Sequence, residues 1–326
     1  MKPIIFLTLM LSLLLAACAP VEQATPAMAL VHTRPPAATQ APARPQAPTE
    51  AAVTSRPTPS ATPSSTPGPV RTRPADGMAM VHVPAGPFIM GEDASAAQSF
   101  CSWHYVNCQV IPDTWKQESP RHTVTLDAFW IDRTEVTNAM YGRCVRAGAC
   151  PPLKFALFTP VPSDYYTGAQ IADLPVVDVD WDSASAYCAW AGARLPTEAE
   201  WEKAARGTDG RIMPWGNDPP RDDMVNYSQN HRGLSKVGSY PAGASPYGAL
   251  DMAGNASEWV ADLYAGDYYA TSPATNPQGP ADSWGRVVRG SSWYGVWYQL
   301  PTYYRYGTGA TDHTNGRGFR CAASAP

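Results

Sequence analysis

The feature that most restricts how this chain can fold is a long proline-rich stretch near its start. Residues 19–75 consist mainly of Pro, Ala, Thr and Ser and contain almost no aliphatic or aromatic side chains. Such a composition cannot bury enough apolar surface to offset the entropy that is lost on ordering. We therefore expect a disordered linker over residues 18–76. A single domain at residues 77–326 is long enough to bury one core.

The segment before the linker has the organisation of a bacterial lipoprotein signal peptide, which we place at residues 1–17. Lys2 precedes an apolar stretch at residues 4–15. A membrane-spanning helix needs about 20 apolar residues, so this stretch fits the core of a signal peptide instead. Leu15-Ala16-Ala17-Cys18 resembles the lipobox. We expect cleavage before Cys18, lipidation of its sulfur and an extracytoplasmic domain anchored in the cell envelope. The alternative is an ordinary secretory signal in which Cys18 is incidental.

Capping residues and apolar spacing predict three helices in the domain. Thr137 can cap one that continues through Val145, and Thr197 with Glu200 forms the capping box of another. A shorter helix is expected at residues 182–190. Few helices among many loops indicate an α+β domain that needs additional fastening. Short strands between Gly, Pro and Asn turns are expected at residues 80–83, 88–90, 122–126, 129–132, 287–289 and 318–321.

Six cysteines of the domain can supply that fastening. An even number of cysteines in an exported chain favours disulfides, although six allow fifteen pairings. Two pairs are close enough in the chain to close small loops, which would leave Cys188 with Cys321. The residues are Cys101 with Cys108, and Cys144 with Cys150.

Composition and spacing argue against two other kinds of site. The net charge of −4 is mild, and basic residues do not interleave with aromatic ones as a nucleic-acid surface requires. The sequence contains no Cys-x-x-Cys, and its histidines are scattered, so a zinc site is not expected.

Several blocks along the domain carry a family resemblance. In this order they are similar to the formylglycine-generating enzyme, or sulfatase-modifying factor, domain. The resemblance covers residues 77–323 and implies a variant of the C-type lectin fold with little regular secondary structure. It also implies a disulfide between Cys188 and Cys321. The blocks are residues 83–86 with Gly91, and residues 132–138, 195–202, 214–217, 251–259, 288–293 and 318–321.

The catalytic feature of that family is missing at the expected place. In its active members two cysteines follow an Arg-Gly-Gly-Ser block, bind copper and activate oxygen to convert a sulfatase cysteine to formylglycine. Soft thiolates are the ligands that Cu(I) requires. Here the expected positions fall near Gly295 and Leu300, and no cysteine lies between Cys188 and Cys321. We therefore expect no copper.

The resemblance also implies structural Ca²⁺. Family members bind it through the Gly-Asn-x-x-Glu-Trp block and through an asparagine after the Trp-Gly-Asn block, which Asn255, Glu258 and Asn226 match. Amide and carboxylate oxygens suit this cation. The alternative is that Asn255 caps a turn and Glu258 pairs with an arginine. The usual family residue at position 257 is Trp, so Ser257 is expected to loosen the local packing.

Aromatic residues crowd the segment that forms the substrate groove in the enzymes. Polar-tipped aromatic side chains are suited to binding a peptide or a sugar. We expect Trp293 and Tyr304 to lie in the core. For Tyr294, Trp297 and Tyr298 the choice between core and groove stays open. The candidate ligand-groove residues are Ser292, Tyr294, Trp297, Tyr298 and Arg305.

Two function classes follow. We expect a non-catalytic binding or scaffold module, anchored to a membrane, whose partner is an extracytoplasmic protein, peptide or glycan. The alternative is a divergent protein-modifying enzyme, either a formylglycine-generating oxidoreductase acting on a sulfatase cysteine or an enzyme with a related activity.

Overall fold

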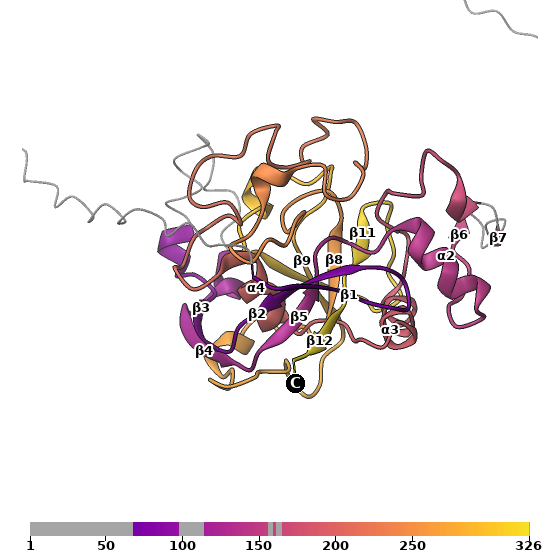
Figure 1. Cartoon of the computed structure of the whole chain (residues 1–326). Helices are drawn as coiled ribbons and strands as arrows, with labels where there is room; N and C mark the ends of the chain where they lie inside the picture. Colours follow the sequence, from indigo (N-terminus) through magenta and orange to yellow (C-terminus); the bar gives the residue numbers. More distant parts are fainter. Residues whose placement is uncertain (1–67, 98–113, 156–158, 161–164, 326) are drawn as a thin grey trace, which may run out of the picture. The chain divides into compact units, whose positions relative to one another are not determined.

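The computed structural model describes residues 68–97, 114–155, 159–160 and 165–325. These residues form short strands, three α-helices of nine or ten residues and long irregular connections. The predicted α+β class, with little regular secondary structure, is thereby confirmed (Figure 1). Cys101 and Cys108 lie outside the described residues.

The first sheet is antiparallel throughout and has the strand order β1-β2-β5-β12. Its edge strand β1 comes from the segment that we assigned to the linker. The boundary at residue 77 is therefore wrong, because β1 pairs with β2 and because the buried Arg73 and Asp76 also precede it. The strands are β1 (Val70–Thr72), β2 (Ala79–Val83), β5 (Phe129–Asp132) and β12 (Ala322–Ser324).

The second sheet has the order β10-β9-β8-β11, and β11 runs parallel to β8. Its β9 and β11 agree with the predicted strands to within two residues at each end. The strands are β8 (Ser257–Leu263), β9 (Arg286–Arg289), β10 (Arg305–Thr308) and β11 (Arg317–Phe319). Two antiparallel two-stranded sheets are also present among the described residues: β3 (Gly86–Met90) with β4 (His122–Leu126), and β6 (Lys154–Phe155) with β7 (Thr159–Pro160).

The three predicted helices are present. Thr137 caps α2 (Asn138–Arg146) by accepting from the Met140 amide. The capping box of α4 (Glu198–Arg206) is complete, with Thr197 and Glu200 bonded reciprocally. Helix α3 (Trp181–Trp190) begins one residue earlier than predicted, because Asp180 is its cap. In Figure 1, α2 and α3 lie at one side of the domain, whereas α4 lies against β3 and β4.

Helix α4 is buried around its whole circumference. Its Trp201, Ala204 and Ala205 join an apolar cluster with β2, β3, β4 and β9. A second cluster gathers the inner faces of α2 and α3 around Trp259 and Phe319. The polar residues of α4 therefore need partners inside the protein, and these partners define the site below.

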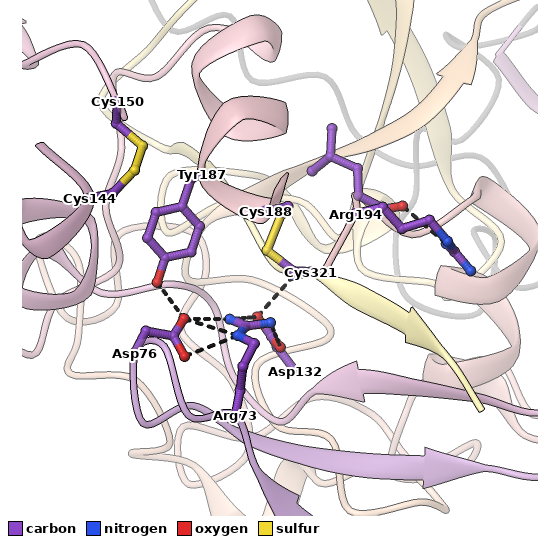
Figure 2. Close-up of a disulfide and its surroundings, with 10 residues drawn as sticks. Arg73, Asp76, Asp132, Cys144, Cys150, Tyr187, Cys188, Arg194 and Cys321 are labelled. Atoms are coloured by element: carbon purple, nitrogen blue, oxygen red, sulfur yellow. Dashed lines mark hydrogen bonds and ion pairs between the residues drawn. A yellow bond between two sulfur atoms is a disulfide. The ribbon is translucent and has the colours of Figure 1, made fainter. Parts of the chain in front are cut away.

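Two disulfides fasten the loops. Cys144 pairs with Cys150 at the end of α2, and Cys188 of α3 pairs with Cys321 beside β12, in agreement with the predicted pairings. Figure 2 shows the second bridge above a buried ion cluster. In this cluster Arg73 pairs with Asp76 at 2.6 Å and with Asp132 at 2.7 Å.

No helix among the described residues is both long and apolar enough to cross a membrane.

Candidate functional site

A buried ion-pair network lies between α4 and the second sheet. Glu198, Glu202 and Arg206 are spaced four residues apart, so they share one face of α4. Arg289 of β9 donates to Glu202 at 2.6 Å, and Arg305 of β10 donates to Glu198 at 2.6 Å. Burial would raise the pKa of Glu198, but the guanidinium groups of Arg305 and Arg289 outweigh it and lower this pKa.

The network corrects one sequence prediction. Arg305 was a candidate for orienting a ligand, yet its side chain is fully buried and both Glu198 carboxylate oxygens accept from it. Arg305 also donates to the carbonyls of Gln117 and Ala265. A buried arginine engaged in this way holds the core together and is not free to bind a ligand.

Glu258 of β8 also pairs inside the protein. Its two carboxylate oxygens each accept from Arg320 at 2.7 Å, and one of them also accepts from Trp201 Nε1 at 2.7 Å. The structure therefore agrees with the alternative interpretation, in which Glu258 pairs with an arginine. Glu258 as a calcium ligand would require this buried pair to break.

Oxygen atoms suited to a hard cation lie beside Glu258 instead. Glu135 Oε2, Asp251 Oδ1 and Asn226 Oδ1 are buried and accept from no donor among the described residues. The Glu135 and Asp251 carboxyls lie close enough to hydrogen-bond to each other when one of them is protonated. Asn255 joins two of these side chains, since its amide donates to Glu135 at 3.0 Å and its carbonyl oxygen accepts from Asn226 at 3.2 Å. Burial raises the pKa of Glu135, and the nearby Asp251 carboxylate raises it further.

This donor set fits Ca²⁺, because carboxylate and amide oxygens are the ligands it prefers. Of the three predicted ligands, only Asn226 retains an unpaired oxygen, while the oxygen of Asn255 accepts hydrogen bonds from Ser235 and Asn226. Glu135 and Asp251, which the sequence analysis did not name, carry two of the unpaired oxygens. No group of three or more His, Cys, Asp or Glu side chains within the described part of the chain is arranged to hold a metal.

A pocket of about 290 Å³ opens at one end of the second sheet. The sheet contributes one residue from β8 and one from β10, and the turn that follows β9 supplies two serines. Every lining side chain is uncharged, and six of the seven carry a hydroxyl group. The lining residues are Ser257, Ser291, Ser292, Tyr294, Gln299, Tyr304 and Tyr306.

The turn after β9 has an unusual backbone. Ser291 has φ +63°, in the left-handed region that a side chain occupies only at a cost of about 1–3 kcal/mol. Its side chain is 3% exposed, and its Oγ has no hydrogen-bond partner among the described residues. A buried hydroxyl without a partner, on a strained backbone and in a residue that lines a pocket, needs an explanation, and a ligand in the pocket would supply one.

The candidate groove residues divide between this pocket and the core. Ser292 and Tyr294 line the pocket, and Tyr294 is 39% exposed. Trp297 and Tyr298 instead belong to a third apolar cluster around Leu300. Tyr304, which we expected in the core, is largely buried but contributes to the pocket wall.

Sequence reasoning missed most of the lining. Ser291 and Ser257 carried a signal, since each departs from a family block: Ser291 stands at the second glycine of Arg-Gly-Gly-Ser, and Ser257 stands where tryptophan is usual. Tyr306 was one of the aromatic residues that crowd the groove segment but was not chosen as a candidate, and Gln299 carried no signal. They reach the pocket only through the turn around Leu300 and through strand β10.

Fold and site together define a class: a disulfide-fastened α+β module with a charged core and an uncharged, hydroxyl-lined pocket. Residues 66–325 match the model of the sulfatase-modifying factor enzyme 1-like domain. The chain belongs to this family.

Named relatives include both active and inactive proteins. The chain is 32% identical over 297 residues to the inactive C-alpha-formylglycine-generating enzyme 2 of Mus musculus, covering 76% of this chain and 86% of that relative. It is 32% identical over 308 residues to the formylglycine-generating enzyme of Streptomyces coelicolor, covering 78% and 91%. Among solved structures, PvdO from Pseudomonas aeruginosa has a similar fold, with a TM-score of 0.61 at 24% identity over 80% of this chain and 99% of that one.

Proposed function

We propose that this protein is a lipid-anchored, extracytoplasmic binding module without formylglycine-generating activity. Its ligand site is the hydroxyl-lined pocket at the end of the second sheet. The observation that carries the proposal is the packing around Gly295, one of the two positions where the family resemblance places the catalytic cysteines.

The space for a side chain at position 295 is already filled. A Cβ atom at Gly295 would lie 2.1 Å from Ser291 Oγ and 3.0 Å from Gln299 Oε1. Such contacts require a neighbour to move. Ser291 therefore occupies the space that a cysteine side chain at position 295 would need. The serine at position 291 fits only because position 295 is a glycine.

The second position supports the same conclusion. Leu300 is fully buried and packs with Met213, Val225 and Tyr303. An aliphatic side chain in an apolar cluster offers no ligand to copper. The relatives include an inactive protein as well as enzymes, so their names do not decide whether this chain is active. The proposal therefore rests on positions 295 and 300.

Calcium is the metal that we propose for the domain, in a structural role. Glu135, Asp251 and Asn226 would hold it, with Asn255 positioning two of them. The bound ion would neutralise two buried carboxylates whose pKa values burial raises. It would also fasten three loops that have no regular secondary structure.

The extracytoplasmic location follows from the cysteines. The described part of the domain contains two disulfides, and such bonds persist in oxidising compartments and are rare in the cytosol. Lipidation at Cys18 would add the anchor.

A copper titration tests the proposal. The oxidised protein, with both disulfides intact, is titrated with Cu(I) against a competing chelator and is assayed on a peptide that contains a sulfatase cysteine motif. We expect no tight copper binding and no aldehyde product. A Cys101→Ser, Cys108→Ser variant serves as the control, because it removes the other two cysteines of the domain. Stoichiometric Cu(I) binding that survives in this variant, together with turnover, would establish the enzyme alternative.

A further inference from the structure

The chemistry of the pocket wall restricts what it can bind. None of the seven described lining residues carries a charge, so this part of the wall has no group that could neutralise a phosphate, carboxylate or ammonium. The charged residues of the neighbouring strands face elsewhere: Arg289 and Arg305 pair with α4, and Glu258 pairs with Arg320. A buried ionic group on the ligand would therefore remain uncompensated.

Arg317 is a cation that lies close to the pocket residues Ser257 and Tyr306. It lies next to Ser257 in the β8–β11 register, but its guanidinium packs over the Trp259 ring at 4.7 Å and near the Tyr306 ring at 5.8 Å. Its Nη1 donates to the Asp312 carbonyl. Arg317 therefore supports the wall from behind and does not line the pocket.

Part of the hydrogen-bonding capacity of the wall is not used within the described residues, although Ser257 Oγ donates to the Gly316 carbonyl and Tyr294 Oη bonds to Thr314. Ser291 Oγ has no partner among the described residues. Tyr304 Oη accepts from Gln299 Nε2 at 3.0 Å, so the phenol proton is left to donate. The bond from Tyr306 Oη to Ser257 Oγ is long, at 3.4 Å. The wall thus offers hydroxyl groups that both donate and accept, at several points of a small volume.

The wall also presents aromatic faces. Tyr294, Tyr304 and Tyr306 line the same pocket, and Tyr294 stands at its open rim. Its volume of about 290 Å³ is near the lower limit of small-molecule sites, about 300 Å³. A compact ligand with apolar C–H faces and many hydroxyl groups satisfies both kinds of surface.

We propose that the pocket binds one residue of an uncharged saccharide, with Ser291 and Tyr304 as hydrogen-bonding contacts and the tyrosine rings as packing surfaces. This inference rests on the proposed function as a binding module and names its ligand. An extended peptide fits less well. Peptide strands are recognised through a free strand edge, whereas here η2 (Thr114–Glu118) lies against the edge strand β10, where Arg305 donates to Gln117.

The test uses the full chain in a zwitterionic detergent, because sugar-headgroup detergents would compete. Chitotriose, cellotriose and maltotriose are the neutral probes, sialyllactose and trigalacturonic acid are the charged ones, and a random decapeptide library is the peptide probe. Binding is measured by saturation-transfer NMR and calorimetry. We expect at least one neutral probe to bind and both charged probes to fail.

Two variants assign the binding to this pocket. Ser291→Gly removes the hydroxyl and also the strained side-chain conformation, so the fold should be at least as stable as before. Loss of one buried hydrogen bond predicts about tenfold weaker binding. Tyr304→Phe should weaken binding similarly. Ser272→Ala, which removes an exposed hydroxyl outside the pocket, is the matched control.

The remaining outcomes overturn the inference in distinguishable ways. Binding of only the charged saccharides, or of only peptides, refutes the uncharged saccharide but leaves a binding module in place. Neutral-probe binding that Ser291→Gly and Tyr304→Phe leave unchanged places the ligand elsewhere. No binding of any probe, combined with copper binding and turnover, refutes both the ligand and the proposed function.

Discussion

At the scale of single residues, Ser291 and Gly295 share one small space. Gly295→Ala would place its Cβ against Ser291 Oγ, so we expect a loss of about 1–3 kcal/mol in the free energy of unfolding. Adding Ser291→Gly removes the obstructing hydroxyl, and the double variant should recover most of that loss. Urea unfolding of the four proteins measures the coupling. Effects that add to within about 0.5 kcal/mol would show that the two residues do not compete.

A single buried carboxyl, Asp262, should make stability depend on pH. Burial raises its pKa to about 8, with Glu198 adding to the effect. The unfolded chain releases this proton near its ordinary pKa of 3.8. Between these values the folded state binds more protons, so stability falls as pH rises. The slope from this group is at most about 1.4 kcal/mol per pH unit.

Asp262→Asn should flatten that slope. Urea unfolding at pH 5, 6.5 and 8 compares it with the wild type and with Asp282→Asn, which alters an exposed aspartate. We expect the Asp262 variant to gain stability relative to the wild type as pH rises and the Asp282 variant to follow the wild type. An unchanged slope in Asp262→Asn would assign the pH dependence to other buried acids.

At the scale of elements, local sequence signals were sufficient to predict the three helices but not all strands of the second sheet. Thr137, Asp180 and Thr197 start their helices through contacts three residues away, which a sequence displays directly. Strand β8 shows no alternation, since both of its faces are buried over Ser257–Leu263. Arg305 was misplaced for a related reason: its partner Glu198 lies 107 residues away in sequence, and only the fold brings them together.

The two disulfides should contribute differently to the free energy of unfolding, because they close loops of different length. Cys188 and Cys321 are separated by 133 residues, and Cys144 and Cys150 by six. The chain-entropy model gives about 5 kcal/mol for the long closure and about 2 kcal/mol for the short one. Paired alanine substitutions at each bridge, compared by urea unfolding, should reproduce this order. A larger loss at Cys144–Cys150 would show that local packing outweighs loop closure.

At the scale of the whole molecule, calcium should shift the melting temperature of the domain. Any ligand that binds only the folded state stabilises it, by about 2.7 kcal/mol at one hundred times its dissociation constant. The raised pKa values of Glu135 and Asp251 mean that protons compete with Ca²⁺, so the shift should grow with pH. Asp251→Asn should abolish it, whereas Asp223→Asn, at an exposed residue, should not. A full calcium response in Asp251→Asn would place the ion elsewhere.

A lipid anchor at Cys18, as proposed above, would decide where the pocket can act. Residues 19–67 separate Cys18 from the first described residue of the domain, and a lipidated Cys18 would hold the protein at an envelope surface. Stable anchoring takes more than one acyl chain, since a single chain binds only reversibly. We expect the wild type to incorporate labelled palmitate and to partition into the detergent phase of Triton X-114. Cys18→Ala should lose the label, while Cys101→Ala keeps it. Label retained in Cys18→Ala would mean that another residue carries the lipid and that the lipobox assignment is wrong.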